Sequence, residues 1–375
     1  MKRVAALIFH PPVGKSAPEQ FVEGGRLAAT QDMIAALRQA GTAEILLLTP
    51  EPSLLDGLDA EAVRPVQSPT HGFHFGETLQ RLIREYRLDG FLYFGSGSGG
   101  LVSPRQLQRM VGFAGRSAPS GLFNNFYSCD FAAVSGAQSL LDLQLPSADN
   151  PLGFALADSG ISCYALPRCL ETQYDIDTPI DLLLLSASEL GGPYLRRYVD
   201  DVPFEHPFIE PVLKLFTERS AHIALLGRVN PENWSRFERE VACRTSGLIE
   251  GRGMRAASLR VDPLLHQLLK ENGIPNFFRL LANSADGAML DTRPLLCGRG
   301  ELPTPHDRFS SDLLLPDDVT DPVWRAFTEE ALSSPIPILL GGHSLLSGGL
   351  HLISRACWKG RDLPRRLHPE PYSWQ

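Results

Sequence analysis

The stretch of sequence with the most distinctive chemistry is the octapeptide from Asp175 to Leu182, which reads Asp-Ile-Asp-Thr-Pro-Ile-Asp-Leu. Thr178 and the aspartates are residue types that accept hydrogen bonds from the free backbone N–H groups at the start of a helix, and Pro179 suits the first helical turn. The octapeptide therefore predicts a helix beginning here. A helix cap without a metal is one complete explanation of it.

A glycine-rich loop, Gly95-Ser96-Gly97-Ser98-Gly99-Gly100, follows the apolar run Phe91–Phe94 and precedes a helix that Pro104 opens. Backbone N–H groups in such a loop can bind a phosphate, because the N-terminus of a helix carries a partial positive charge. Gly97, Ser98 and Gly99 are the candidate contacts. A simple tight turn is the alternative interpretation.

Two further segments concentrate polar groups next to predicted strands. Asn124 to Asp130 offers Asn125, Tyr127 and Ser128 as contacts for a substrate, although a turn between two strands explains the same residue types. Gly14-Lys15-Ser16 is similar to the end of a phosphate-binding P-loop. The glycine that a P-loop needs five positions earlier is Phe9, so a true P-loop is not expected.

The octapeptide resembles the D-x-D-T-P-x-D-L element of nucleotidyltransferases with a glycosyltransferase-A-like fold, of the molybdenum-cofactor and phospholactate guanylyltransferase type. The order and spacing of the predicted elements extend this resemblance over residues 1–190. The resemblance implies a metal-binding carboxylate at Asp177, with Asp175 supporting it or binding as well. It also implies Mg²⁺, which would offset the charge of a nucleoside triphosphate before attack.

The chain departs from that family at several positions. The loop at residues 95–100 lacks the family's first metal-binding aspartate, whose place falls near Ser98, and Asp130 is a candidate replacement. The family's N-terminal glycine-rich loop is also missing, so Gly14 with Lys15 or Arg26 is the candidate for holding the phosphates. Gly76 and Thr78 match the region beside the nucleotide base, although capping of a helix explains Thr78 equally well.

Three histidines and several arginines remain open. His71 and His74 lie three positions apart, but a catalytic zinc site would need a third ligand. His343, in a glycine-rich stretch, suits proton transfer or ligand contact, and a buried structural histidine is the alternative. The basic pairs that could reach an anionic substrate are Arg252 with Arg255 and Arg293 with Arg299.

Short apolar runs alternate with amphipathic stretches in the first half, which is typical of parallel strands joined by helices. The fold class is therefore α/β, with a mostly parallel, doubly wound sheet in residues 1–190 and a mainly α-helical domain of unknown role in residues 200–375. Strands are predicted at Val4–Phe9, Ile45–Leu48, Phe91–Phe94, Leu122–Phe126, Phe131–Val134 and Cys163–Leu166. Helices are predicted at Leu27–Ala40, Phe75–Tyr86, Pro179–Ser188, Pro211–Glu218, Trp234–Cys243, Leu264–Asn272 and Val323–Leu332.

Composition limits the partners. The chain has 375 residues, of which 43% are apolar, and a formal charge of −8, so two domains are expected and a nucleic-acid partner is not. No apolar stretch is long enough for a bilayer span, which predicts no membrane partner and a cytoplasmic protein. The six cysteines form no C-x-x-C pair, so neither a zinc site nor a disulfide framework is expected.

The leading hypothesis is a divergent nucleotidyltransferase that binds a nucleotide or phosphorylated small molecule and transfers a nucleotidyl group to a phosphorylated acceptor. In it Asp177, Asp130 and Lys15 have catalytic roles. Whether the chain is an enzyme stays open, because so much of the family signature is altered. A non-catalytic binding or scaffold protein, in which a homo-oligomer is possible, is the alternative, and transfer from a nucleotide-sugar is the third.

Overall fold

The computed structural model describes residues 2–10, 12, 14–42, 44–50, 63–67, 72–251, 262–297 and 301–361. The described chain divides into two compact units. Unit 1 contains residues up to Ile176 together with Gly191–Tyr198, and unit 2 contains Asp177–Leu190 and the described residues from Val199 onwards. This division differs from the predicted 1–190 and 200–375, because the helix that follows the octapeptide packs with the second unit. His71, Arg252, Arg255 and Arg299 lie outside the described residues.

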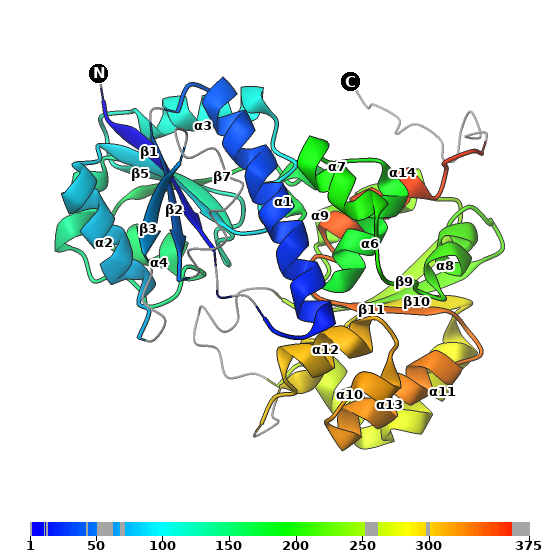
Figure 1. The fold of residues 1–375 in the computed structure, drawn as a ribbon. Coiled ribbons are helices and arrows are strands. Elements are labelled where there is room, and N and C mark those ends of the chain that lie inside the picture. The colour runs from blue at the N-terminus through cyan, green and yellow to red at the C-terminus, as the bar shows by residue number, and fades with distance from the viewer. Residues whose placement is uncertain are drawn as a thin grey trace, which may run out of the picture. The chain divides into compact units, whose positions relative to one another are not determined.

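Unit 1 is built on a seven-stranded sheet with the strand order β3-β2-β1-β4-β6-β5-β7 (Figure 1). All neighbouring strands are parallel except β6, which runs antiparallel to β4 and β5. The strands are β1 (Val4–Phe9), β2 (Glu44–Thr49), β3 (Arg64–Gln67), β4 (Gly90–Gly95), β5 (Ser120–Phe123), β6 (Phe131–Ser135) and β7 (Ser162–Ala165). The mixed α/β architecture with a mostly parallel sheet is as the sequence predicts.

Helices cover both faces of this sheet because the central strands are apolar on both sides. Alternate residues of β1 lie in separate cores: Leu7 packs in a core with Phe75 and Leu79, and Ile8 in one with Met33 and Leu107. The helical segments are α1 (Ala17–Gln39), α2 (Phe75–Tyr86), α3 (Pro104–Ala114), η2 (Ala137–Asp142), α4 (Leu152–Asp158), α5 (Leu170–Gln173) and α7 (Pro193–Asp200), whose last residues belong to unit 2.

The observed start of α1 is ten residues before the predicted one at Leu27. Ser16 is the N-cap, and it forms a capping box with Glu19, whose carboxylate accepts from the Ser16 backbone N–H at 3.1 Å. Pro18 stands in the first turn, where proline needs no partner for a missing N–H. The predicted bounds of β1 and α2 agree with the structure.

Unit 2 contains a four-stranded, fully parallel sheet with the order β11-β10-β8-β9. Its strands are β8 (His222–Gly227), β9 (Arg244–Ile249), β10 (Gly287–Asp291) and β11 (Ile338–Gly341). Most of the described regular structure in residues 200–375 is helical, as predicted, but the predicted elements do not include this sheet. The strands are four to six residues long, and short buried apolar runs cannot be told from helix by periodicity.

The helices of unit 2 lie on the two faces of this sheet, α10, α11 and α13 on one and α6, α9 and α14 on the other (Figure 1). Their bounds are α6 (Pro179–Ser188), α8 (Ile209–Leu215), α9 (Pro231–Glu240), α10 (Leu264–Asn272), α11 (Ile274–Ser284), η3 (Pro294–Leu296), α12 (Pro305–Asp312), η4 (Pro316–Asp318), α13 (Pro322–Ser333) and α14 (Gly348–Ala356). The core on the first face is rich in aromatic rings, among which Trp324 and Phe327 stack at 4.6 Å.

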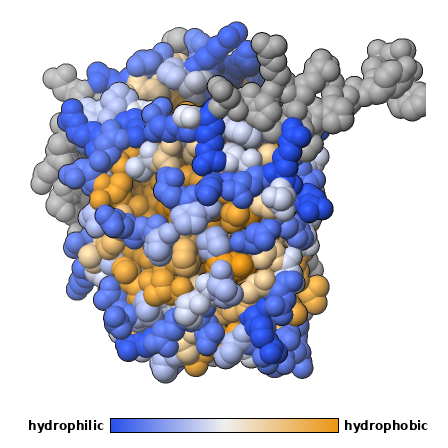
Figure 2. Space-filling model, turned by 90° about the vertical axis from the view of Figure 1, so that its right-hand side faces the viewer, coloured by the Kyte–Doolittle hydropathy of each residue, from blue (hydrophilic) through white to orange (hydrophobic). Residues whose placement is uncertain are grey.

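The face of the molecule drawn in Figure 2 shows apolar residues reaching the surface among polar ones. Among the described residues, no helix combines the length and the apolar character that crossing a bilayer requires.

Candidate active site

The glycine-rich loop at residues 95–100 is held by hydrogen bonds to its own backbone and to the backbones of Phe9 and Asp130. The buried Ser98 hydroxyl lies 2.7 Å from the carbonyl oxygen of Gly95 and 3.0 Å from that of Asp130, to which it donates. The backbone N–H of Gly95 also donates to the Asp130 carbonyl at 3.0 Å, and that of Ser96 to Phe9 at 3.0 Å. Ser98 therefore fixes the turn at the carboxyl ends of β1 and β4.

Glycine at position 97 allows the octapeptide to approach this loop. Gly97 has φ +94°, and a Cβ atom there would lie 2.9 Å from the carbonyl oxygen of Ile176 and 3.2 Å from Asp175 Oδ1. The Ile176 N–H donates to the Gly97 carbonyl at 3.2 Å, and Ser98 and Asp175 form an isolated β-bridge. Only glycine tolerates both this backbone conformation and this close contact.

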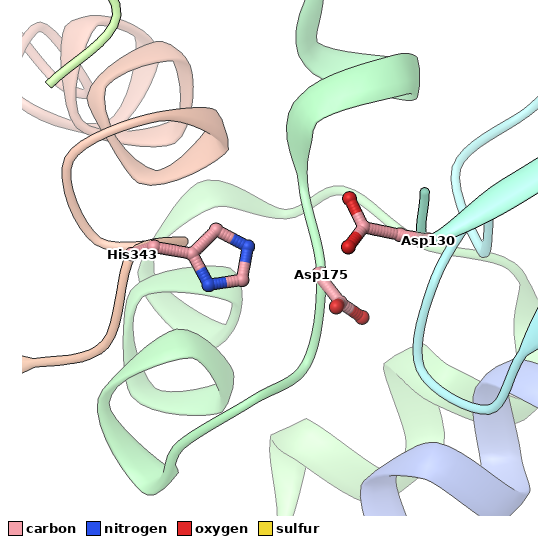
Figure 3. A group of neighbouring side chains, drawn as sticks. All are labelled: Asp130, Asp175 and His343. Atoms are coloured by element: carbon pink, nitrogen blue, oxygen red, sulfur yellow. The ribbon is translucent and has the colours of Figure 1, made fainter. Parts of the chain in front are cut away.

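The structure brings Asp130 and Asp175 together at the same edge of the sheet. A carboxylate oxygen of one lies within 4.8 Å of a carboxylate oxygen of the other (Figure 3). Asn124, which is 4% exposed, orients Asp130: its Nδ2 donates to Asp130 Oδ2 at 2.8 Å, and its Oδ1 accepts from the Asp130 N–H at 3.0 Å. His343, also drawn in Figure 3, belongs to unit 2 and is described below with that unit.

Arg26 of α1 holds the segment that carries Asp175 in place. Its Nε donates to the carbonyl oxygen of Ile176 at 2.8 Å, and its Nη1 contacts Glu23 at 2.9 Å. The predicted phosphate-binding role of Arg26 stays a prediction. In the structure the guanidinium positions the backbone next to Asp175.

A buried acidic network lies behind Asp130. The Tyr93 hydroxyl donates to Asp149 Oδ2. Burial raises the pKa of Asp149, and the nearby charge of Asp130 raises it further. Burial and the charge of Asp149 likewise hold the pKa of Tyr93 well above its usual range. Burial and the neighbouring carboxylates thus favour the neutral forms of Asp149 and Tyr93.

The predicted acceptor residues lie on the same turn as Asp130. Asn125 Oδ1 accepts from the Tyr127 N–H at 3.1 Å, and the Ser128 hydroxyl donates to Asn150 Oδ1 at 2.6 Å. Tyr127 is 53% exposed, with its ring edge against Phe126. The polar groups of Asn125 and Ser128 thus stabilise the turn, and Tyr127 is presented to solvent.

Of the remaining nucleotide-binding candidates of unit 1, Gly14, Gly76 and Thr78 pack against neighbouring residues of the protein. A Cβ at Gly14 would lie 2.3 Å from that of Glu19, and one at Gly76 would lie 2.4 Å from that of Leu145. Thr78 is buried in α2, and the N-cap of that helix is His74, whose Nδ1 accepts from the Glu77 N–H at 3.2 Å. Lys15 is exposed. The nucleotide contacts proposed for these residues stay predictions.

The last aspartates of the octapeptide belong to unit 2, where they begin α6. Asp181 Oδ2 accepts from the backbone N–H groups of Asp177 at 3.0 Å and Thr178 at 2.8 Å, which confirms the predicted helix start. Burial, and then the charge of Asp177, raises the pKa of Asp181 to about 8.

Asp177 itself makes a contact that its sequence does not predict. Its Oδ2 lies 2.8 Å from Nδ1 of His343, and His343 is 8% exposed. Asp175 and Asp177 therefore fall in different units, although one residue separates them. The role of Asp177 as a metal ligand stays a prediction.

Unit 1 is thus a mixed α/β domain with a carboxylate pair at the carboxyl edge of its central strands. Solved structures similar to this chain include a nucleotidyl transferase from Methanothermobacter thermautotroptrophicus, 21% identical with a TM-score of 0.39 over 52% of this chain and 99% of its own. A cytidylyltransferase from Leptospira borgpetersenii serovar Hardjo-bovis is 14% identical with a TM-score of 0.38 over 55% of this chain and 100% of its own.

A third solved structure is Rv0371c from Mycobacterium tuberculosis H37Rv in complex with manganese. It is 16% identical with a TM-score of 0.32 over 54% of this chain and 100% of its own. No protein-family model matches the sequence, and no curated protein matches it. Each of these structural likenesses spans about half of the chain.

Proposed function

We propose that unit 1 binds a nucleoside triphosphate through a divalent cation held by Asp130 and Asp175, and transfers the nucleotidyl group to a phosphorylated small molecule. The observation that carries this proposal is the approach of the two carboxylates to within 4.8 Å at the carboxyl edge of the sheet. Carboxylate oxygens are the ligands that Mg²⁺ and Mn²⁺ prefer. The resemblance of the octapeptide to nucleotidyltransferases supplies the reaction type.

In the proposed reaction an acceptor phosphate oxygen attacks the α-phosphorus. A new P–O bond forms, the bond from the α-phosphorus to the bridging oxygen breaks, and pyrophosphate leaves with that electron pair. A bound cation would offset the charge of the triphosphate during this step. The chain's own residues position the site: Asn124 orients Asp130, and Arg26 with Gly97 fixes the backbone next to Asp175.

A second candidate is a non-catalytic binding protein. The hydroxyl groups of Ser98 and Ser128 and the amide of Asn125 make hydrogen bonds within the protein's own turns. An acceptor substrate would have to replace these hydrogen bonds in order to contact the same groups. This favours a protein that binds a ligand without catalysing a reaction.

Calorimetric titration with GTP, CTP, ATP and UTP, with and without Mg²⁺ or Mn²⁺, separates the two candidates. We expect binding of at least one nucleotide to require the cation and to weaken at least tenfold in Asp130→Asn and in Asp175→Asn. Asp158→Asn is the matched control, because Asp158 is exposed at the end of α4. Asp177→Ala in the same titration tests the predicted role of that residue.

Metal-independent binding, or equal binding by Asp130→Asn and wild type, would contradict the cation site. Absence of binding to any of the four nucleotides would favour the non-catalytic candidate. Release of pyrophosphate in the presence of a phosphorylated acceptor would establish catalysis.

A further inference from the structure

The strand order of unit 2 defines a second place where a ligand can bind. From β8 the chain continues to β9 on one side of it, and β10 and β11 are then added on the other side. The connections thus diverge between β8 and β10. In open parallel sheets, ligands bind outside the carboxyl ends of the strands at such a switch point.

An ion pair lies at this point. Arg228, directly after β8, donates from Nε to Asp291 Oδ2 at 2.6 Å and from Nη2 to Asp291 Oδ1 at 3.0 Å. Asp291 is fully buried at the end of β10, and Gly227 lets the two strand ends approach, since a Cβ there would lie 2.4 Å from that of Asp291. The Arg228 side chain is 26% exposed, and Nη1 makes no hydrogen bond to any described residue.

His343 follows β11 at the same edge. Its Nδ1 is held by Asp177 at 2.8 Å, whereas its Nε2 is buried and has no hydrogen-bond partner within the described part of the chain. A carboxylate on Nδ1 fixes the orientation of the ring and leaves Nε2 as the atom for a ligand. Burial of a polar atom without a partner is costly, so its retention calls for an explanation.

Asn233 repeats this pattern beside β8. It lies in the first turn of α9, which follows that strand, and its side chain is 1% exposed. Neither Nδ2 nor Oδ1 has a hydrogen-bond partner among the residues that the structure describes. Two buried and unsatisfied side chains therefore follow two strands, β8 and β11, that both border β10.

Hydrogen-bond donors at this edge suit an anion. Helices α9 and α14 both begin after strands of this sheet, and helix N-termini carry partial positive charge. Arg228 adds N–H donors that suit phosphate oxygens.

We propose that the carboxyl edge of the four-stranded sheet is a binding site for a phosphate-bearing small molecule, contacted by Arg228, Asn233 and His343. This proposal concerns residues of unit 2 and does not depend on the proposed nucleotidyl transfer.

The test is a titration with inorganic phosphate, followed in the imidazole ¹H–¹⁵N NMR spectrum of the full chain in the presence of EDTA. We expect a saturable shift of the His343 ring resonances, which are identified by their loss in His343→Asn. That variant keeps an amide donor near the Nδ1 position and removes Nε2. Calorimetry with the same phosphate should give at least tenfold weaker binding for His343→Asn.

Asn233→Leu is a second variant. Its expected result differs from the result that a purely structural role of the amide would give. If the amide is kept for a ligand, replacing it by an apolar side chain of similar size should leave Tm unchanged or raise it, while phosphate binding falls at least tenfold. Asp175→Asn, in unit 1, should bind phosphate as the wild type does. No saturable shift in the wild type, or wild-type phosphate affinity in both His343→Asn and Asn233→Leu, would overturn the proposal.

Discussion

The carboxyl edges of the two sheets are stabilised in different ways. In unit 1, Ser98 and Asn124 hold the edge through hydrogen bonds between uncharged side chains and nearby backbone or carboxylate groups. In unit 2, buried carboxylates pair with arginines: Asp291 with Arg228, and Asp312 with Arg293 at 2.7 Å. The first edge relies on local turn chemistry, whereas the second relies on pairing of opposite charges in a low-dielectric interior.

The largest expected effect comes from breaking an ion pair of unit 2. Arg228→Gln leaves the carboxylate of Asp291 fully buried without its charge partner, which should lower the free energy of unfolding by about 3–5 kcal/mol. Every described tryptophan, Trp234, Trp324 and Trp358, belongs to unit 2. Urea unfolding followed by tryptophan fluorescence therefore reports on this unit.

The double variant Arg228→Met with Asp291→Leu is the control for that experiment. Replacing both partners by apolar residues removes the unpaired charge and should restore most of the lost stability. A double variant as unstable as Arg228→Gln would show that the pair is not the cause.

A second effect depends on pH and on the partly buried His206 of unit 2. Burial lowers the pKa of His206 to about 4 from its ordinary value of 6.5. The folded state therefore binds fewer protons than the unfolded state between these values, and stability is lost as the pH falls from 6.5 to 4, by up to about 1.4 kcal/mol per pH unit.

His206→Gln should flatten this part of the pH profile, as measured by urea unfolding at half-unit steps. The control is His222→Gln, at a partly exposed position at the start of β8. A wild-type slope that persists in His206→Gln would assign the effect to another group.

Asn124 tests the edge of unit 1, which uncharged side chains hold in place. Asn124→Ala leaves the buried backbone N–H groups of Asp130 and Phe131 without their acceptor, and should cost about 2–3 kcal/mol. The loss should be visible in urea unfolding followed by circular dichroism, together with weaker cation binding because Asp130 is no longer oriented. Asn125→Ala, which removes one turn hydrogen bond, should cost only about 1 kcal/mol.

A further effect on stability is expected at Gly97. Gly97→Ala forces a side chain into positive φ and against the Ile176 carbonyl oxygen, and should cost about 2 kcal/mol in unfolding experiments. Gly160 has φ +77° but no atom within 4 Å of a built Cβ, so Gly160→Ala measures the backbone cost alone. Equal losses for the two variants would mean that the approach of residue 176 imposes no steric demand.

Much of unit 1 could be predicted from sequence because its signals are local. The apolar run Val4–Phe9, the amphipathic pattern of Phe75–Tyr86 and the proline-marked start of α6 gave the observed bounds. The start of α1 differs from the predicted one because the Ser16 and Glu19 capping pair begins the helix ahead of the apolar periodicity. Asp130 and Asp175 were both candidates, but their proximity depends on the antiparallel β6, which no local pattern indicates.

The edge of unit 2 could not be predicted for a similar reason. Arg228 and Asp291 pair across 63 positions of sequence, and each is an ordinary charged residue when read alone. His343 was noticed for its glycine-rich surroundings, whereas its contact with Asp177 depends on α6 packing against β11. Asn233 carried no signal, because asparagine early in a helix is common.

Segments of the two units alternate along the chain, which affects folding during synthesis. Helix α6 is translated before α7, yet α6 packs against β11 and α14 near the other end of the chain. Its apolar side chains, Ile180 and Leu182 to Leu185, are buried only when those partners have left the ribosome. The nascent chain therefore exposes the apolar side chains of α6 during most of the synthesis of unit 2. We expect a chaperone to bind α6 during this time, and a chain that ends at Leu190 to aggregate.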